Sequence, residues 1–183
     1  MSFSFTLLDS EKEYLHQLVQ TSIKTMLDGD EDAAIPEPPT LKLKSPLGAF
    51  VTLKIGGRLR GCIGNLQSAG ELYSTIWNMA RSAAFRDPRF PALTAEEFPK
   101  LDVEISVLSP IELCRDLNEI RVGRHGLVVQ RGPKSGILLP QVATELGWNR
   151  DQFLGRTCAK AGLPEDAWQK VGTTVYWFEA EIF

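Results

Sequence analysis

The stretch AFVTLKIGGRLRGCI, residues 49–63, decides the fold expected for this chain of 183 residues. Two runs of mostly apolar residues, Ala49–Ile55 and Arg58–Ile63, lie on either side of the pair Gly56-Gly57. Glycine adopts positive φ without a steric penalty, and such a pair is typical of a two-residue turn between antiparallel strands. The stretch therefore predicts a β-hairpin.

The simplest register of this hairpin places Val51 opposite Cys62. Successive side chains of a strand point to opposite faces, so Arg60 would share a face with Cys62. Leu59 and Ile63 would then share the other face. This register makes an arginine the near neighbour of a thiol.

The rest of the chain mixes helical and strand patterns. Apolar residues recur at helical spacing between Ser10 and Gly29, where Ser10 and Glu13 have the form of a capping box, and again over residues 71–86. Apolar and polar residues alternate in LDVEISVL, residues 101–108, which indicates a half-buried strand. Strands are also expected near Ile120, at 127–130, at 137–139 and at the C-terminus, with further helices at 141–146 and after Asn149. We expect an α+β fold with a mainly antiparallel sheet and flanking helices.

The domain organisation follows from length and from one polar segment. Residues 1–183 suit a single domain, built either as one body or as two sublobes. Residues 28–46 are acidic and proline-rich, which predicts an extended connector or a lid.

Composition disfavours several classes of function. The chain has 20 Lys and Arg against 23 Asp and Glu, a net charge of −3, and lacks the basic excess that phosphate-backbone binding usually requires. RNA binding stays open only as an alternative. No secretory leader and no apolar stretch of membrane-spanning length is apparent, so we expect a cytoplasmic protein.

Cysteine and histidine usage predicts neither a metal nor a cofactor. The three cysteines, Cys62, Cys114 and Cys158, are odd in number and far apart, and none belongs to a C-x-x-C motif. Two histidines in the whole chain leave few ligands for a metal ion. We expect three reduced thiols and no disulfide framework.

Cys62 has two interpretations. As a nucleophile it would need access and a stabilised thiolate, to which Arg60 could contribute. As a structural residue it would fill a small space in the hairpin, where the neighbouring Gly61 and Gly64 allow close approach of backbone. His125 is a poor candidate for its base, because its GRHG context indicates a turn residue.

The arginines near the hairpin also have two interpretations. The segment RDPRF follows the second expected helix and would form an exposed loop. Guanidinium groups could hold an anion there, or they could form structural ion pairs. The candidate ligand-binding or cleft residues are Arg60, Gly61, Gly64, Arg86, Asp87, Arg89 and Glu104, the last of which would face away from the core.

The order of several motifs resembles the AMMECR1 family from about Phe50 to Phe183. These motifs include LRGCIG at residues 59–64, AAFRDPRFPALTAEEF, LDVEISVLSP, GRHGLVVQ, GILLPQVATELGW and FLGRTCAKAGLP. The resemblance implies an α+β fold of two lobes with a cleft. It also implies a link to a MEMO-family protein and a radical-SAM protein, as in the type called AmmeMemoRadiSam system protein A, but no established reaction. Iron–sulfur chemistry would belong to the partner, because this chain has no C-x-x-x-C-x-x-C.

The leading hypothesis is a cytoplasmic, cofactor-free protein that binds a partner or a small anionic ligand in a cleft near the LRGCIG hairpin. A cysteine-dependent enzyme that uses Cys62 on a nucleotide or protein substrate is the first alternative. An RNA-binding accessory factor is the second.

Overall fold

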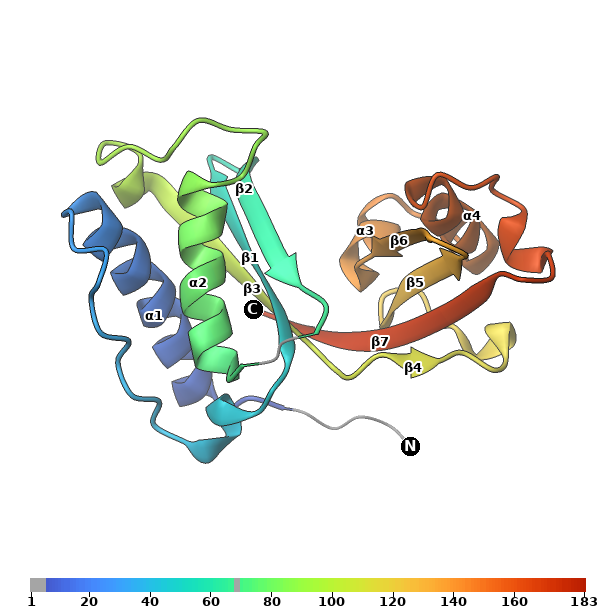
Figure 1. The fold of residues 1–183 in the computed structure, drawn as a ribbon, viewed down its shortest axis with the longest axis horizontal. Helices are drawn as coiled ribbons and strands as arrows, with labels where there is room; N and C mark the ends of the chain where they lie inside the picture. Colours follow the sequence, from blue (N-terminus) through green and yellow to red (C-terminus); the bar gives the residue numbers. More distant parts are fainter. Residues whose placement is uncertain (1–5, 68–69) are drawn as a thin grey trace. The chain divides into compact units, whose positions relative to one another are not determined.

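A computed structural model describes residues 6–67 and 70–183, which divide into two compact units (Figure 1). The N-terminal unit contains the chain through Leu108 and also Glu181–Phe183, and the C-terminal unit contains Ser109–Ala180. Within the described ranges, no helix is long and apolar enough to cross a membrane.

The N-terminal unit packs two helices on one face of an antiparallel sheet (Figure 1). Its elements in chain order are α1 (Asp9–Leu27), a 3-10 helix (Leu41–Lys44), β1 (Gly48–Ile55), β2 (Arg58–Asn65), α2 (Leu72–Phe85), a second 3-10 helix (Phe98–Lys100) and β3 (Leu101–Leu108). The strand order is β2-β1-β3, so β2 forms one edge of the sheet. The last residue, Phe183, exchanges backbone hydrogen bonds with Ile105 of β3.

Alternation along β1 and β3 divides their residues between two faces. Val51 and Leu53 of β1 and Ile105 of β3 are completely buried with apolar residues of the helices. The residues between them, including Thr52 and Glu104, therefore face away from the helices. This second face, which we call the open face, carries the polar residues of the unit's sheet.

The C-terminal unit has its own sheet and its own core. Its elements are β4 (Glu112–Leu113), a 3-10 helix (Leu117–Glu119), β5 (His125–Arg131), β6 (Lys134–Leu138), α3 (Pro140–Glu145), α4 (Arg150–Lys160), a further 3-10 helix (Ala167–Gln169) and β7 (Thr174–Ile182), whose last residues belong to the N-terminal unit. Strand β7 lies between β5 and β4, and β6 pairs with β5. The strand pairs are antiparallel in both units, which confirms the predicted α+β class.

The hairpin forms as predicted, but its register differs from the simplest one. Gly56 and Gly57 have φ of 55° and 75°, as a two-residue hairpin turn requires. A β-bulge then shifts the pairing, so that Val51 lies opposite Ile63 and Thr52 lies opposite Cys62. The predicted pairing of Val51 with Cys62 is wrong, because one extra residue on β2 has no partner on β1.

The bulge also separates two residues that the simple register placed on one face. Leu59 lies opposite Lys54, which shares the open face with Thr52, whereas Ile63 lies opposite the core residue Val51. Leu59 is therefore on the face of Cys62, and Ile63 packs partly against the core. Arg60 is the extra residue of the bulge.

Other local expectations also need correction. Helix α1 begins at Asp9, and it is the Glu11 side chain that reaches back to the Leu8 N–H at 2.8 Å, in place of the predicted Ser10 and Glu13 pair. The residues before Ile120 form a 3-10 helix and not a strand. The predicted connector contains the 3-10 helix at Leu41–Lys44, which buries Leu43 completely.

Candidate functional site

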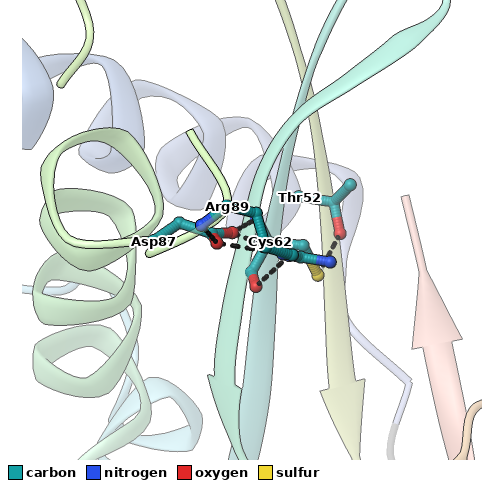
Figure 2. Close-up of polar contacts among 4 residues, drawn as sticks. All are labelled: Thr52, Cys62, Asp87 and Arg89. Carbon is teal, nitrogen blue, oxygen red and sulfur yellow. Dashed lines mark hydrogen bonds and ion pairs between the residues drawn. The ribbon is translucent and has the colours of Figure 1, made fainter. Parts of the chain in front are cut away.

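Two segments of the N-terminal unit meet at Cys62: the hairpin and the loop that follows α2 (Figure 2). We call this region the hairpin–loop junction and define it by the residues Arg60, Cys62, Asp87, Arg89, Phe90 and Glu97. The sequence provides the loop because Pro88 prevents Asp87 from adopting helical backbone, and α2 accordingly ends at Phe85.

The loop holds the peptide groups of Cys62 from outside the sheet. The Cys62 N–H donates to Asp87 Oδ2 at 2.9 Å, and Arg89 Nη2 donates to the Cys62 carbonyl at 3.1 Å. An edge strand has such unpaired backbone groups, and here two side chains satisfy them. Because both groups point away from β1, Cys62 and Thr52 form a non-hydrogen-bonded pair of the antiparallel ladder.

This pairing explains the environment of the Cys62 sulfur. Side chains of a non-hydrogen-bonded pair lie close together, and Thr52 Oγ1 donates to Cys62 Sγ at 3.2 Å (Figure 2). On its other side, Thr52 pairs with Glu104 of β3. The Glu104 carboxylate binds Lys54 Nζ at 2.9 Å. A thiol, a hydroxyl and a carboxylate therefore form a row across the open face.

Asp87 is the buried centre of the loop's contacts. Its side chain is 1% exposed, whereas that of Arg89 is 53% exposed. Asp87 Oδ1 accepts from Arg89 Nε at 2.9 Å and Oδ2 accepts from Arg89 Nη2 at 2.7 Å. The Arg89 guanidinium, with the Cys62 and Arg89 backbone N–H groups, holds the pKa of Asp87 well below its usual range. Only part of the predicted exposed loop is exposed, since Asp87 points inward.

Arg60 forms the second charged pair of the junction. Its Nε and Nη2 each donate to the Glu97 carboxylate at 2.9 Å, and Nη2 also donates to the Pro91 carbonyl at 3.0 Å. The hydrogen bonds from Arg60 lower the pKa of Glu97 to about 2. The Arg60 side chain is 10% exposed. Within the described residues, its Nη1 is buried and has no hydrogen-bond partner.

Phe90 connects the two charged pairs. The guanidinium carbon of Arg60 lies 5.9 Å from the centre of the Phe90 ring, and that of Arg89 lies 5.5 Å from it. Both distances allow cation–π attraction. Arg86, which follows α2, is exposed and makes no side-chain hydrogen bond or ion pair within the described parts of the chain. The junction therefore contains two arginines engaged by carboxylates, and Arg86, just before it in the chain, is a third arginine with its charge in solvent.

The glycines of LRGCIG allow close packing. A Cβ at Gly61 would collide with the carbonyl of Ala83 in α2, and one at Gly64 would collide with the Phe50 ring and the Ala49 carbonyl. Both glycines have the structural role that the sequence suggested, the close approach of backbone, and neither has a positive φ.

The remaining candidates have structural surroundings. His125 begins β5 in the C-terminal unit, where its Nδ1 accepts from the Arg121 N–H at 3.1 Å and its ring contacts Trp177. His125 is thus a strand residue that directly follows the turn at 122–124 and not the predicted turn residue, and burial lowers its pKa. Cys114 and Cys158 are buried. Among the described residues, no group of three His, Cys, Asp or Glu side chains could hold a metal ion.

Sequence reasoning missed Phe90 and Glu97 as members of the junction, and it missed Thr52 as the residue that contacts the Cys62 sulfur. A signal existed for Thr52, which is the one hydroxyl residue within AFVTLKI. The spacing of Glu97 from Thr94 is a local signal for a turn, and Glu97 does accept from the Thr94 N–H at 3.0 Å. Its bond to Arg60 spans 37 residues, a separation at which local patterns carry no information.

Comparisons with known proteins agree on one family. The AMMECR1 family model matches residues 16–183. A protein of Methanothermobacter thermautotrophicus is 42% identical over 179 residues, covering 94% of this chain and 93% of its own length. A protein of Pyrobaculum islandicum is 43% identical, covering 94% of this chain and 82% of its own. The crystal structure of the uncharacterized protein PH0010 from Pyrococcus horikoshii has a TM-score of 0.90 and 40% identity, covering 97% of this chain and 93% of that one. The chain described here belongs to the AMMECR1 family.

Proposed function

We propose that this AMMECR1-family chain is a binding protein that holds a small oxyanion, a phosphate or a carboxylate group, at the hairpin–loop junction. The observation that carries the proposal is Arg60 Nη1, a buried donor without a partner within the described residues, beside the Phe90 ring that Arg89 also contacts. An unsatisfied buried donor of a charged group is costly, and a bound oxygen atom would satisfy it.

The surrounding charges suit an anion. Arg89 is more than half exposed although it binds Asp87, and Arg86 adds an exposed guanidinium three residues earlier in the chain. Guanidinium groups bind carboxylates and phosphates with paired, charge-assisted hydrogen bonds. The carboxylates of Asp87 and Glu97 offset part of this charge, so weak binding that falls with added salt is expected.

Charge reversal at Arg86 tests this proposal. Arg86→Glu should weaken binding of inorganic phosphate by about tenfold in low salt, because a positive charge beside the loop is replaced by a negative one that repels the anion. Calorimetric titration measures the affinity. Since Arg86 has no partner within the described residues, the thermal midpoint should stay within about 2 °C of the parent, as for other exposed substitutions.

Arg115→Glu is the matched control for Arg86→Glu. Arg115 is exposed in the C-terminal unit, so the same change of charge there should leave phosphate affinity unchanged. An equal loss of phosphate affinity in both variants would show that the effect comes from the net charge of the chain and not from the position of Arg86. Unchanged affinity in Arg86→Glu would contradict the proposed role of this arginine. Arg89→Glu is unsuitable for this test, because it would break the ion pair with the buried Asp87 and so destabilise the fold.

The resemblance to AmmeMemoRadiSam system proteins adds a macromolecular partner to the proposal. We propose that the chain works together with a MEMO-family protein and a radical-SAM protein, and that this assembly is cytoplasmic. Co-purification of tagged chain with each protein from the native host tests the link. Recovery of neither protein, with the tagged chain folded, would contradict it.

A cysteine-dependent enzyme is the second candidate function, favoured by the hydrogen bond from Thr52 to the Cys62 sulfur. A hydroxyl that donates to sulfur stabilises negative charge on it and fixes its position. Burial raises the pKa of Cys114 to about 11 and also raises the pKa of Cys158. Cys62 is half-buried.

Thiol labelling tests this second candidate. With iodoacetamide at pH ~8, Cys62 should react at least about tenfold faster than Cys114 or Cys158, because buried thiols with raised pKa are inert. Thr52→Val should slow labelling of Cys62, and Thr52→Ser, which keeps the hydroxyl, should restore it. Peptide mass spectrometry identifies the labelled residue. Labelling of Cys62 as slow as that of the two buried thiols would exclude a nucleophilic role.

A further inference from the structure

The pair of Arg60 and Glu97 combines features that a purely structural ion pair does not need. Glu97 binds the Nε–Nη2 edge of the guanidinium with two hydrogen bonds of 2.9 Å, which is the arrangement that a bound carboxylate or phosphate would also take. The guanidinium retains an unused donor at Nη1. Arg60 thus offers more donors than its internal partners accept.

Arg60 and Glu97 also differ in burial and in the elements that hold them. Arg60 is fixed in β2, at the bulge, and is nine-tenths buried. Glu97 is 31% exposed and lies in the connection between α2 and β3, within a turn that Thr94 and Glu97 close with their own hydrogen bonds. Rotation of the Glu97 side chain away from Arg60 would free the Nε–Nη2 edge of the guanidinium without a shift of β2.

We propose that Glu97 is an internal competitor of the oxyanion ligand, so that ligand binding at Arg60 displaces the Glu97 carboxylate. This inference rests on the proposed function and deepens it, because it names Arg60 as the binding group and Glu97 as the autoinhibitory contact. The ligand shares the chemistry of Glu97, an oxyanion that accepts two parallel N–H bonds. Phosphate and carboxylate compounds both have this chemistry.

Neither Arg60 nor Glu97 changes its charge in the physiological pH range, so any pH dependence of the competition there comes from the ligand. The bonds from Arg60 keep Glu97 ionised down to about pH 2, and the pKa of Arg60 is raised above its ordinary value by the same pair. Release of Arg60 must therefore come from the concentration and charge of the ligand.

Glu97→Gln tests the inference. Glutamine keeps the shape and one acceptor oxygen but removes the negative charge, so phosphate should bind about tenfold more tightly than to the parent. Glu96→Gln is the matched control: Glu96 is the exposed neighbour and its substitution should change affinity much less. Titration with inorganic phosphate and, separately, with acetate distinguishes a phosphate from a carboxylate ligand. Tighter binding of one anion by Glu97→Gln identifies the class.

The outcomes separate this inference from the proposed function. If Glu97→Gln binds phosphate and acetate no more tightly than the parent while Arg86→Glu still binds phosphate more weakly, Glu97 does not compete with the ligand. The proposed oxyanion site would stand in that case. Absence of saturable binding in the parent and in Glu97→Gln would overturn both. If Glu97→Gln is unfolded by circular dichroism, Glu97→Asp replaces it. Aspartate withdraws the carboxylate by one methylene and should also tighten phosphate binding, and unchanged affinity there would contradict the inference.

Discussion

Gly61→Ala should lower the free energy of unfolding by about 3 kcal/mol or more, which corresponds to a fall of roughly 6–12 °C in the thermal midpoint for a chain of this size. The added Cβ would collide with the Ala83 carbonyl, a backbone group within helix α2. A backbone oxygen cannot move aside as a flexible side chain can, so either the helix or β2 must shift. Thermal and urea unfolding measure the loss.

Gly56→Asn is the control for this prediction. Gly56 has positive φ and no atom within 4 Å of an added Cβ, and asparagine tolerates this conformation in a hairpin turn. Its stability should remain close to that of the parent. If Gly61→Ala is as stable as Gly56→Asn, the close approach of β2 and α2 is wrong.

Asp87→Asn should destabilise the chain by about 1.5–3 kcal/mol, the range for hydrogen bonds to a charged group, because Asp87 is buried whereas its partner Arg89 is half exposed. Asp87 accepts from the Cys62 N–H, the Arg89 N–H and the Arg89 guanidinium. Asparagine places an NH₂ group against donors on one side and leaves Arg89 without its counter-charge. Asp32→Asn, at an exposed position of the acidic segment, should have little effect.

The carboxylates of Asp87 and Glu97 make the free energy of unfolding depend on pH. Their pKa values are lower in the folded than in the unfolded chain, so their contribution is fully present above the unfolded values near pH ~4 and is lost as the pH falls through the folded ones. Unfolding free energy should therefore fall steadily below about pH 5 in the parent and less steeply in Asp87→Asn. Equal slopes in both proteins would contradict the role of Asp87.

The sequence predicted the hairpin because the turn is local. Gly56 and Gly57 specify it through backbone conformation, which two residues determine by themselves. The bulge at Arg60 was not predictable in the same way. It depends on contacts of Arg60 with Glu97 and Pro91, which are more than 30 residues away, and these override the simple alternation of side chains.

The candidate site was predicted in its residue types and not in its pairing. The sequence singled out Arg60, Asp87 and Arg89 but offered anion binding and structural pairing as equal interpretations. The structure shows that both arginines are paired with carboxylates. It adds that Arg60 keeps one donor unused within the described residues. Whether a buried donor has a hydrogen-bond partner depends on all of its neighbours in space, and these do not belong to a single sequence motif.

An NMR titration of the arginine side chains would detect an oxyanion bound at the hairpin–loop junction. The Nε–H groups of Arg60 and Arg89 are hydrogen-bonded to carboxylates, which slows their exchange with water. Addition of inorganic phosphate in low salt should shift both Nε–H signals along one saturable curve, with a weaker midpoint in Arg86→Glu. Signals of Arg60 and Arg89 that stay unchanged throughout the titration would contradict the account.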